Sequence, residues 1–360
     1  MEKGDDQKSS GILSKEMKGK IRVDMKRMDE QLQKHFDKAW LSEKINELEQ
    51  AAVKDWEIDC SKLVINNFIA TGAFGSVYKG SYNGQDVAVK VLDLGNESKK
   101  ATLRKIFLQE ISIWNKLDHP NITKFIGARR GISDVNFIQG CDEEMSRNAW
   151  CLVVEYVPGG TLKSFLLKNK IKRLPFNLVI KLSLDIAKGL SYLHFYKIVH
   201  RDVKTENMLI DEVGRVKITD FGVSRFESLN PVEMTEQTGT LGYMAPEVLS
   251  GGGYNHKCDV YSFGICLWEI YCCAMPKSNM NQLKNSSTLS YENWRPTIPE
   301  HCPSNLANMM KRCWDKDPNR RPEMKEVVDM LEVIERNEKK RFQNQIKGCW
   351  CFLKQPKIRE

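Results

Sequence analysis

Along the 360 residues the spacing of the apolar residues changes from strand-like to helical, and this change limits the folds that the chain can adopt. From residue 61 to about 157, short runs rich in β-branched residues are separated by turn signals such as Tyr82-Asn-Gly-Gln. After Thr161 apolar residues recur mostly at helical spacing, with strand-like runs near 208–211 and 216–219. The sequence therefore predicts an α+β chain, with a small β-rich half followed by a larger α-rich half.

Within the β-rich half, apolar alternation predicts several short strands and one helix. Strands are expected at 62–69, 76–81, 86–92 and 152–156, and the helix at about 103–117. Residues 129–150 are polar and irregular, which indicates a surface insertion between two strands.

The first 60 residues are predicted to form a helical, charged extension. Between residues 21 and 52, apolar residues recur every three or four positions, as in one long amphipathic helix or two shorter ones. We expect this helix to pack on its own domain or to lie in solvent. A partner-binding or self-associating helix is the alternative, although the drifting spacing breaks strict heptads.

Charge is concentrated at the ends of the chain. Of the net charge of +8, residues 1–60 contribute −2 and residues 336–360 contribute +6, which leaves +4 for the 275 residues between them. This near-neutral middle argues against a nucleic-acid-binding domain, and nucleic acid is not an expected partner.

The number and spacing of the cysteines, together with the lengths of the apolar runs, indicate in which cellular compartment the protein is expected. The chain has 11 cysteines, an odd number, and no pair of Cys-x-x-Cys units, which argues against a structural zinc site. No apolar run approaches the roughly 18 residues that a membrane-spanning helix needs, and the N-terminus is polar. We expect reduced thiols in a cytoplasmic protein that is neither secreted nor membrane-spanning.

A glycine-rich segment lies between the first two expected strands, and it reads Ala70-Thr-Gly72-Ala73-Phe74-Gly75-Ser-Val77. Because no helix follows it, this segment disfavours a dinucleotide-binding fold and suits a flap that closes over phosphates. Lys90 ends the next strand, where its ammonium could hold the α- and β-phosphates. Glu110, in the following helix, is the natural carboxylate to orient that lysine.

A second set of polar residues lies in the helical half. The run His200-Arg-Asp202-Val-Lys204-Thr-Glu-Asn207 places a carboxylate, a cation and an amide on one short loop, and Asp220-Phe221-Gly222 follows. Ala245-Pro246-Glu247 comes later. Phosphoryl transfer needs a carboxylate that positions the attacking hydroxyl, oxygen ligands for Mg²⁺ and a cation for the developing charge. The order and spacing of these motifs indicate this chemistry.

With these motifs, the chain resembles a eukaryotic protein kinase over residues 61–335, about three quarters of its length. The resemblance implies the bilobal protein kinase fold, with a small β-rich N-lobe at about 61–157. A large, mostly α-helical C-lobe would occupy about 158–335. The extension 1–60 and a basic tail with cysteines and aromatic residues at 336–360 would flank the domain.

The resemblance also implies catalytic roles for matching residues. Asp202 would be the catalytic base, and Lys204 would contact the γ-phosphate. Lys90 would pair with Glu110. The metal ligands would be Asn207 and Asp220.

Further matches concern the nucleotide and the structural frame. The ATP-binding residues would be Ile69, Ala70, Gly72, Ala73, Phe74, Gly75, Val77, Ala88, Lys90, Val154, Glu155 and Val157. Val154 would be the gatekeeper, and the hinge would lie at 155–157. Asp259 would hold the catalytic loop from below, and Glu247 would pair with Arg321.

The acceptor hydroxyl is indicated by the loop around Asp202. Lys204, two residues after Asp202, resembles the serine/threonine pattern, whereas tyrosine kinases usually carry Ala-Ala-Arg or Arg-Ala-Ala before the asparagine. Thr240 would touch both residues, which agrees with that pattern. Dual-specificity or tyrosine phosphorylation is a less favoured hypothesis.

Other segments are similar to the tyrosine-kinase-like group, namely Trp268, Cys313-Trp314 and Arg320-Arg321-Pro322. That mixture resembles Raf-like kinases. Residues 56–63, 83–90, 200–208 and 258–275 narrow the resemblance to plant Raf-like mitogen-activated protein kinase kinase kinases of the short, single-domain type.

Two departures from the family pattern leave an alternative open. Ala70 replaces the first glycine of the flap, and its Cβ is tolerable there if φ stays negative. Residues 277–294 are polar and lack the usual helical periodicity, which affects substrate choice or local stability. The alternative is a catalytically weak or inactive pseudokinase scaffold.

Regulation is expected in the activation segment. Arg201 precedes Asp202, so the catalytic loop can pair with an anionic group on that segment. The candidate phosphorylation sites are Ser224, Ser228, Thr235 and Thr238. For each, an ordinary loop hydroxyl is the alternative, and Thr240 is expected to serve the structure.

The tail 347–359 interleaves Cys349 and Cys351 with aromatic and basic residues. Palmitoylation together with a basic patch would meet the two-signal requirement for membrane anchoring. A solvated basic tail with incidental thiols is the alternative.

We therefore expect an enzyme that transfers the γ-phosphate of ATP to serine or threonine of protein substrates, including downstream kinases. The expected metal is Mg²⁺, with Mn²⁺ as an alternative. The expected location is the cytoplasm, with peripheral contact at the plasma membrane if the tail is acylated.

Overall fold

The computed structural model describes residues 56–72, 75–92, 97–130, 136–137, 149–227, 234, 237–276 and 294–352. The chain divides into two compact units, Met1–Glu57 and Ile58–Glu360, and the elements below belong to the second. The helix predicted for 21–52 and the atypical segment 277–293 lie outside the described residues.

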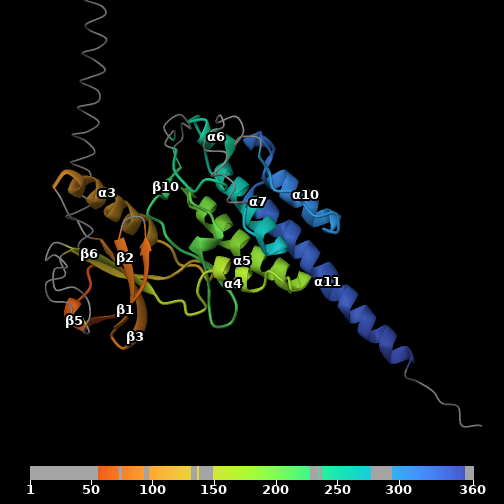
Figure 1. Ribbon diagram of the computed structural model, residues 1–360, viewed down its shortest axis with the longest axis horizontal. Helices are drawn as coiled ribbons and strands as arrows, with labels where there is room; N and C mark the ends of the chain where they lie inside the picture. The colour runs from red at the N-terminus through yellow and green to blue at the C-terminus, as the bar shows by residue number, and fades with distance from the viewer. Residues whose placement is uncertain are drawn as a thin grey trace, which may run out of the picture. The chain divides into compact units, whose positions relative to one another are not determined.

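A six-stranded sheet forms the N-lobe (Figure 1). In sequence order its strands are β1 (Leu63–Gly72), β2 (Gly75–Tyr82), β3 (Gln85–Leu92), β4 (Phe125–Arg130), β5 (Asn136–Phe137) and β6 (Trp150–Glu155). Their spatial order is β4-β6-β3-β2-β1-β5, with antiparallel pairs except for β1 and β5. The β2–β3 hairpin turns through Asn83-Gly84, whose positive φ angles of 51° and 79° suit a tight two-residue turn.

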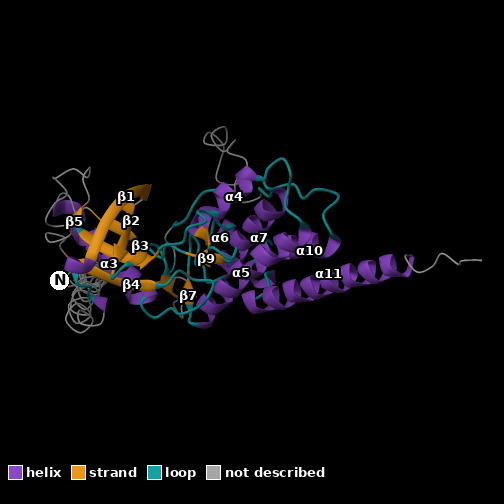
Figure 2. Ribbon diagram, turned by 90° about the horizontal axis from the view of Figure 1, so that it is seen from below, coloured by secondary structure: helices purple, strands orange, loops and turns teal. Residues whose placement is uncertain are grey.

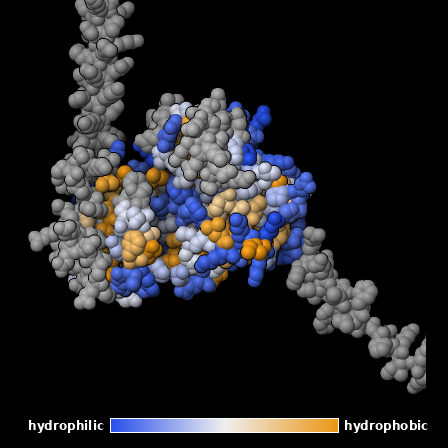
Figure 3. Space-filling model, viewed as in Figure 1, coloured by the Kyte–Doolittle hydropathy of each residue, from blue (hydrophilic) through white to orange (hydrophobic). Residues whose placement is uncertain are grey.

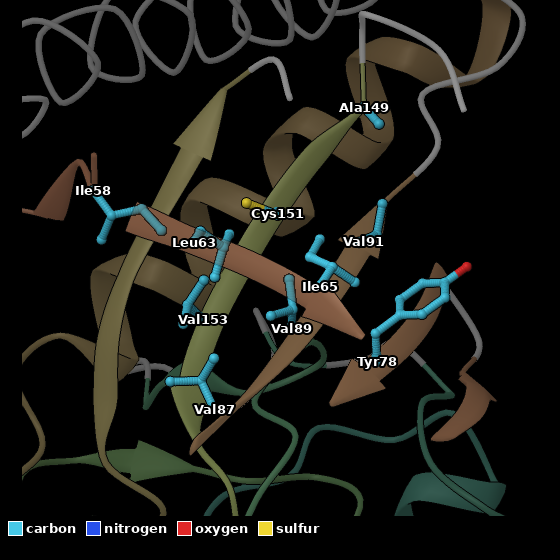
Figure 4. Close-up of a cluster of buried hydrophobic side chains, with 10 residues drawn as sticks. All are labelled: Ile58, Leu63, Ile65, Tyr78, Val87, Val89, Val91, Ala149, Cys151 and Val153. Atoms are coloured by element: carbon cyan, nitrogen blue, oxygen red, sulfur yellow. The ribbon is translucent and has the colours of Figure 1, made fainter. Parts of the chain in front are cut away.

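Alternation along β3 separates the two faces of this sheet. Val87, Val89 and Val91 are buried, whereas Ala88 and Lys90 point to the opposite face. The buried valines join a hydrophobic cluster made of Ile58, Leu63, Ile65, Tyr78, Val87, Val89, Val91, Ala149, Cys151 and Val153 (Figure 4). The cluster covers one face, so Lys90 is left on the face toward helix α3 (Glu97–Trp114).

Helices dominate the C-lobe (Figure 2). They are α4 (Leu162–Lys168), α5 (Phe176–Phe195), α6 (Pro246–Leu249), α7 (Lys257–Cys272), α10 (Ser304–Cys313) and α11 (Met324–Phe352). Helix α7 is buried on nearly all sides, which makes it the centre of this lobe. Helix α5 packs against both α7 and α11, and α10 packs against α7.

Short pairs of strands fix the loops between the lobes. Strand β7 (Ile198–Val199) pairs with β10 (Arg225–Phe226), and β8 (Met208–Ile210) pairs with β9 (Val216–Ile218). The described residues also include the 3₁₀ turns η1 (Cys60–Lys62), η2 (Thr205–Asn207) and η4 (Pro318–Arg320). Because β7 and β10 pair, residues 200–224 begin and end at the same place.

The predicted organisation, a β-rich lobe before a helical lobe, is confirmed. Helix α3 begins at Glu97, earlier than the sequence predicts, and ends at Trp114. Helix α11 continues past residue 336, where we expect the tail to begin, and ends at Phe352. Most of the expected insertion at 129–150 lies outside the described residues.

The surface and the hydropathy agree with a domain that buries its apolar residues. Figure 3 shows apolar residues in small groups among hydrophilic ones on the face displayed. Across the part of the chain that the structure describes, no helix combines the length and the apolar character needed to cross a membrane.

Candidate active site

Lys90 is the meeting point of three distant segments. Its Nζ lies 2.9 and 3.0 Å from the two carboxylate oxygens of Glu110, on α3, and 3.2 Å from Oδ1 of Asp220. Glu110 is completely buried. Asp220 has a positive φ of 66°, a backbone strain that the surrounding contacts must hold. The pair expected between Lys90 and Glu110 is thus present, and Asp220 joins it.

Lys90 and Asp220 stabilise each other's charged form in this cluster, whereas burial raises the pKa of Glu110. Burial alone would lower the pKa of Lys90, but the Glu110 and Asp220 carboxylates outweigh burial and raise that pKa above its ordinary value. Burial would raise the pKa of Asp220, and the neighbouring Lys90 ammonium lowers it instead. An ammonium and an ionised Asp220 carboxylate are therefore both present at neutral pH.

Asp202 is held by three neighbours. The Nδ2 of Asn207 donates to the Asp202 backbone oxygen at 2.9 Å and to Oδ2 at 3.0 Å, and Lys204 Nζ lies 2.7 Å from Oδ2. The hydroxyl of Thr240 donates to Oδ1 at 2.7 Å and accepts from Lys204 Nζ at 2.8 Å. Asp202, Lys204 and Thr240 therefore form a closed ring, and the turn η2 brings Asn207 back to it.

Asp259 supports this loop from the first turn of α7. Its two carboxylate oxygens accept the backbone N–H of His200 at 2.8 Å and of Arg201 at 2.9 Å. Arg201 has a positive φ of 68°, and these bonds fix that strained backbone. Burial would raise the pKa of Asp259, but the hydrogen bond from His194 and the nearby histidines lower it.

Glu247 and Arg321 form the second expected structural pair. The guanidinium contacts both carboxylate oxygens, at 2.6 and 2.8 Å, as the sequence leads us to expect. The side chain of Arg321 is fully buried.

Several residues expected near the nucleotide share one sheet face. Val77 pairs with Lys90, and Ala88 pairs with Val154, so these side chains lie on the face opposite the hydrophobic cluster. Ala70 pairs with Val77 in extended strand β1, a conformation in which a Cβ causes no strain. Ala73 and Phe74 lie outside the described residues.

The remaining expected nucleotide residues differ in their surroundings. Ile69 is about half exposed, whereas Val157 is buried. A Cβ on Gly75 would come within 2.0 Å of the Val91 carbonyl oxygen, so only glycine fits there. Gly72 is the last residue of β1.

The carboxylate of Glu155 is used by the protein itself. Its Oε1 accepts from the backbone N–H of Lys124 and from Lys217 Nζ, each at 2.7 Å. Glu155 stays a predicted hinge residue, in a role that would use its backbone rather than its carboxylate. Sequence reasoning missed Lys217, which stands three residues before Asp220 and shows no local signal beyond its charge.

The candidate phosphorylation sites fall into three groups. Ser224 is completely buried, and its hydroxyl donates to the His200 carbonyl at 3.2 Å. A phosphorylating enzyme cannot reach that hydroxyl in this conformation, which argues against the candidate. Thr238 is half-buried and lines a small cavity with Arg201. Ser228 and Thr235 lie outside the described residues.

Asn207 and Asp220 fit a divalent cation. Because the Asn207 amide nitrogen donates to Asp202, the amide oxygen is left for another partner. The Asp220 side chain is 48% exposed. Among the described residues, no group of three or more His, Cys, Asp or Glu side chains is arranged around a metal position. Two oxygen ligands suit a divalent cation that takes its other ligands from phosphates and water.

Comparison with known protein families decides the identity. The family model "protein tyrosine and serine/threonine kinase" matches residues 63–331. The chain belongs to this family. Its membership confirms the protein kinase assignment, and it implies ATP and a divalent metal ion.

Two relatives of this kinase are proteins of the plant Arabidopsis thaliana. The serine/threonine-protein kinase STY46 of Arabidopsis thaliana is 39% identical over 280 residues, which cover 78% of this chain and 45% of the relative. The serine/threonine/tyrosine-protein kinase HT1 of the same plant is 33% identical over 320 residues, or 84% of this chain and 78% of the relative. The chain thus spans less than half the length of STY46. These relatives agree with the predicted resemblance to plant kinases.

Proposed function

We propose that this kinase transfers the γ-phosphate of Mg·ATP to serine and threonine side chains of proteins, as a Raf-like enzyme of signalling cascades. The observation that carries the proposal is the ring formed by Asp202, Lys204 and Thr240. The ring is joined to the cluster of Lys90, Glu110 and Asp220 through Asn207, whose backbone carbonyl accepts at 3.0 Å the N–H of Thr219, the residue before Asp220. Both groups are assembled at once, which phosphoryl transfer requires.

Each group has its own task in the transfer. Lys90, charged and oriented by Glu110, would hold the α- and β-phosphates. Asp202 would orient the acceptor hydroxyl and take its proton as the new O–P bond forms. The bond between the γ-phosphorus and the bridging oxygen breaks, and ADP leaves with that oxygen.

The remaining polar side chains would balance the negative charge of the phosphates. Lys204 would neutralise charge on the transferred phosphoryl group. Asn207 and Asp220 would hold the metal ion, which when bound neutralises the phosphate charge and fixes its orientation. This division of tasks rests on positioning and electrostatics rather than on covalent catalysis.

Two observations support serine and threonine as acceptors. Lys204 stands two residues after Asp202, and its ammonium reaches the Asp202 carboxylate at 2.7 Å and Thr240 at 2.8 Å. The relative STY46 is named a serine/threonine-protein kinase, whereas HT1 is named a serine/threonine/tyrosine-protein kinase.

The test is transfer of radiolabelled phosphate from Mg·ATP to the chain itself and to a generic protein acceptor, followed by phosphoamino-acid analysis. Label on serine or threonine is expected, and it should vanish in Asp202→Asn and Lys90→Met. Absence of label from folded wild-type protein would refute the proposal. Label on tyrosine alone would refute the acceptor assignment.

Phosphorylation of the activation segment is the regulation that we propose. Thr238 lines the cavity that also contains Arg201, so a phosphate there would meet a cation. Alanine at Thr235 and Thr238 together should lower turnover well below either single change. Unchanged turnover in the double variant would remove this idea.

For location and partners, we propose a cytoplasmic kinase that acts on proteins, including other kinases, with peripheral contact at the plasma membrane through 347–359. The support is the sequence of the tail, in which Cys349 and Cys351 stand among basic and aromatic residues. A membrane-fraction assay compares wild type with Cys349→Ser/Cys351→Ser. Failure of the variant to shift to the soluble fraction would exclude an acylated anchor.

A further inference from the structure

Gln109, the residue before Glu110, makes a contact of its own. Its Nε2 donates to the backbone carbonyl of Ser224 at 2.6 Å, across 115 positions of sequence. Two adjacent residues of α3 thus reach two different partners. Glu110 contacts Lys90 on β3, and Gln109 contacts the chain just after Gly222.

The identity of the donor follows from the acceptor. A carbonyl oxygen only accepts, so the amide nitrogen of Gln109 and not its oxygen must face Ser224. The contact is therefore a directional bond that requires a donor at position 109. A side chain of equal length without a donor would fill the space but lose the bond.

Ser224 is itself firmly held, so it is a suitable anchor. Its backbone N–H donates to the Phe221 carbonyl at 3.0 Å, and its hydroxyl donates to the His200 carbonyl. The next residue, Arg225, starts strand β10, which pairs with β7. The Gln109 bond therefore ties α3 to the backbone that also carries the catalytic loop.

The hydrogen bond between Gln109 and Ser224 joins the same two elements that Lys90 contacts. Lys90 contacts Glu110 on α3 and Asp220 on the activation segment, so both elements must be in place together.

We propose that Gln109 is a positioning residue that couples the position of α3 to the backbone of the activation segment. It does so without touching nucleotide or acceptor. The proposal rests on the proposed kinase function, because its consequence for catalysis is the fraction of molecules in which Lys90 and Glu110 are paired. Movement of residues 221–226 would release α3, and movement of α3 would loosen residues 221–226.

A graded set of substitutions separates this role from simple packing. Gln109→Met keeps the length and removes the donor, Gln109→Lys keeps a donor, and Gln109→Glu places an acceptor against the carbonyl. If only packing mattered, the Met and Lys variants would have similar kcat. If a donor is required, kcat should be highest with Gln or Lys at position 109, lower with Met and lowest with Glu. Asn169→Leu is the matched control, because the Asn169 amide also donates to a backbone carbonyl, that of Phe165 at 2.9 Å, and lies at the end of α4, outside the activation segment.

The experiment measures kcat and KM for ATP in phosphate transfer, with hydrogen–deuterium exchange of the full chain as a second readout. For Gln109→Met we expect kcat to fall about five-fold, the effect of one ordinary hydrogen bond, with KM for ATP unchanged. Exchange should quicken in peptides covering 103–112 and 221–226. Gln109→Lys should restore both readouts, and Asn169→Leu should resemble wild type.

The proposal would be overturned if wild type, Gln109→Met and Gln109→Glu had equal kcat and equal hydrogen–deuterium exchange. It would also be overturned if Gln109→Lys had the same kcat and exchange as Gln109→Met. The two readouts also separate this proposal from the kinase assignment. If wild-type protein transfers no phosphate, the proposed function fails. The exchange of 103–112 and 221–226 still decides whether Gln109 joins the two elements.

Discussion

Arg321 and Glu247 form a two-point ion pair, with Nη1–Oε1 at 2.6 Å and Nη2–Oε2 at 2.8 Å. The buried guanidinium also donates to the backbone carbonyls of Asp315 and Lys257, each at 2.9 Å. One side chain thus joins α6, the start of α7 and the loop before α11. Because α6 follows the activation segment directly, this pair fixes the far end of that segment to the C-lobe.

Removal of one partner of this pair should be costly. In Arg321→Met the Glu247 carboxylate loses its partner in buried surroundings, and we expect the free energy of unfolding to fall by about 3–5 kcal/mol. Urea unfolding followed by circular dichroism measures the change. Arg312→Met is the matched control, since Arg312 and Glu326 are about half exposed and their pair contributes at most about 1 kcal/mol. Similar losses in both variants would contradict the expected difference.

Thr240 should matter through its hydroxyl rather than its size. Thr240→Val keeps the shape but leaves Asp202 Oδ1 and Lys204 Nζ without this partner, so the carboxylate is less well oriented. We expect kcat to fall by between about ten-fold and a hundred-fold, with KM for ATP unchanged. Thr240→Ser keeps the hydroxyl and should retain most of the activity. A serine variant as impaired as the valine variant would show that the methyl group matters instead.

Local patterns in the sequence predict much of this site. Lys90 lies in an alternating strand and Glu110 on the next helix. Their place after the glycine-rich segment singles them out, and the resemblance to protein kinases implies their pairing. The loop from Asp202 to Asn207 carries its polar residues within six positions, and its order and spacing relative to Asp220 and Glu247 make it informative. Each such residue is positioned by its own element, and for this reason its place in the sequence is informative.

Contacts between residues far apart in the sequence could not be predicted from local patterns. The hydroxyl of Ser224 looks like that of any loop serine, and its burial depends on β7 and β10, two-residue strands too short for a periodic signal. The bond from Gln109 joins residues 115 positions apart. Helix α11 continues beyond residue 335 through polar sequence, where ion pairs such as Glu335–Lys339 at 2.9 Å replace the apolar stripe.

The metal dependence of nucleotide binding should run through Asp220. In wild type, Mg²⁺ is expected to tighten the binding of ADP, because Asp220 and Asn207 offer oxygen ligands beside the phosphates. Asp220→Asn removes the charge, and we expect this tightening to weaken by at least roughly ten-fold. Titration of a fluorescent ADP analogue with and without EDTA measures it. Binding in EDTA is the internal control, and a variant that retains the full Mg²⁺ effect would exclude Asp220 as a ligand.

Glu269 gives the domain a pH-dependent stability in the neutral range. It is completely buried on α7, and its Oε1 accepts the hydroxyl of Tyr243 at 2.8 Å. Burial raises the pKa of Glu269 from 4.5 to about 8, and the Tyr243 hydrogen bond offsets only part of that effect. Between these two values the folded protein keeps a proton that the unfolded chain has released. Stability from this group is therefore full below pH 4.5, falls as pH rises toward 8 and is constant above it.

Glu269→Gln keeps the shape and stays neutral at every pH, so it should lose this dependence. We expect the free energy of unfolding of wild type to fall relative to the variant between pH 6 and 8, by at most about 1.4 kcal/mol per pH unit. Glu332→Gln is the control, because Glu332 is 41% exposed beside Lys188 and should follow wild type. Urea titrations at pH 6, 7, 8 and 9 give the comparison. Parallel curves for wild type and Glu269→Gln would mean that Glu269 is ionised in the folded protein across this range.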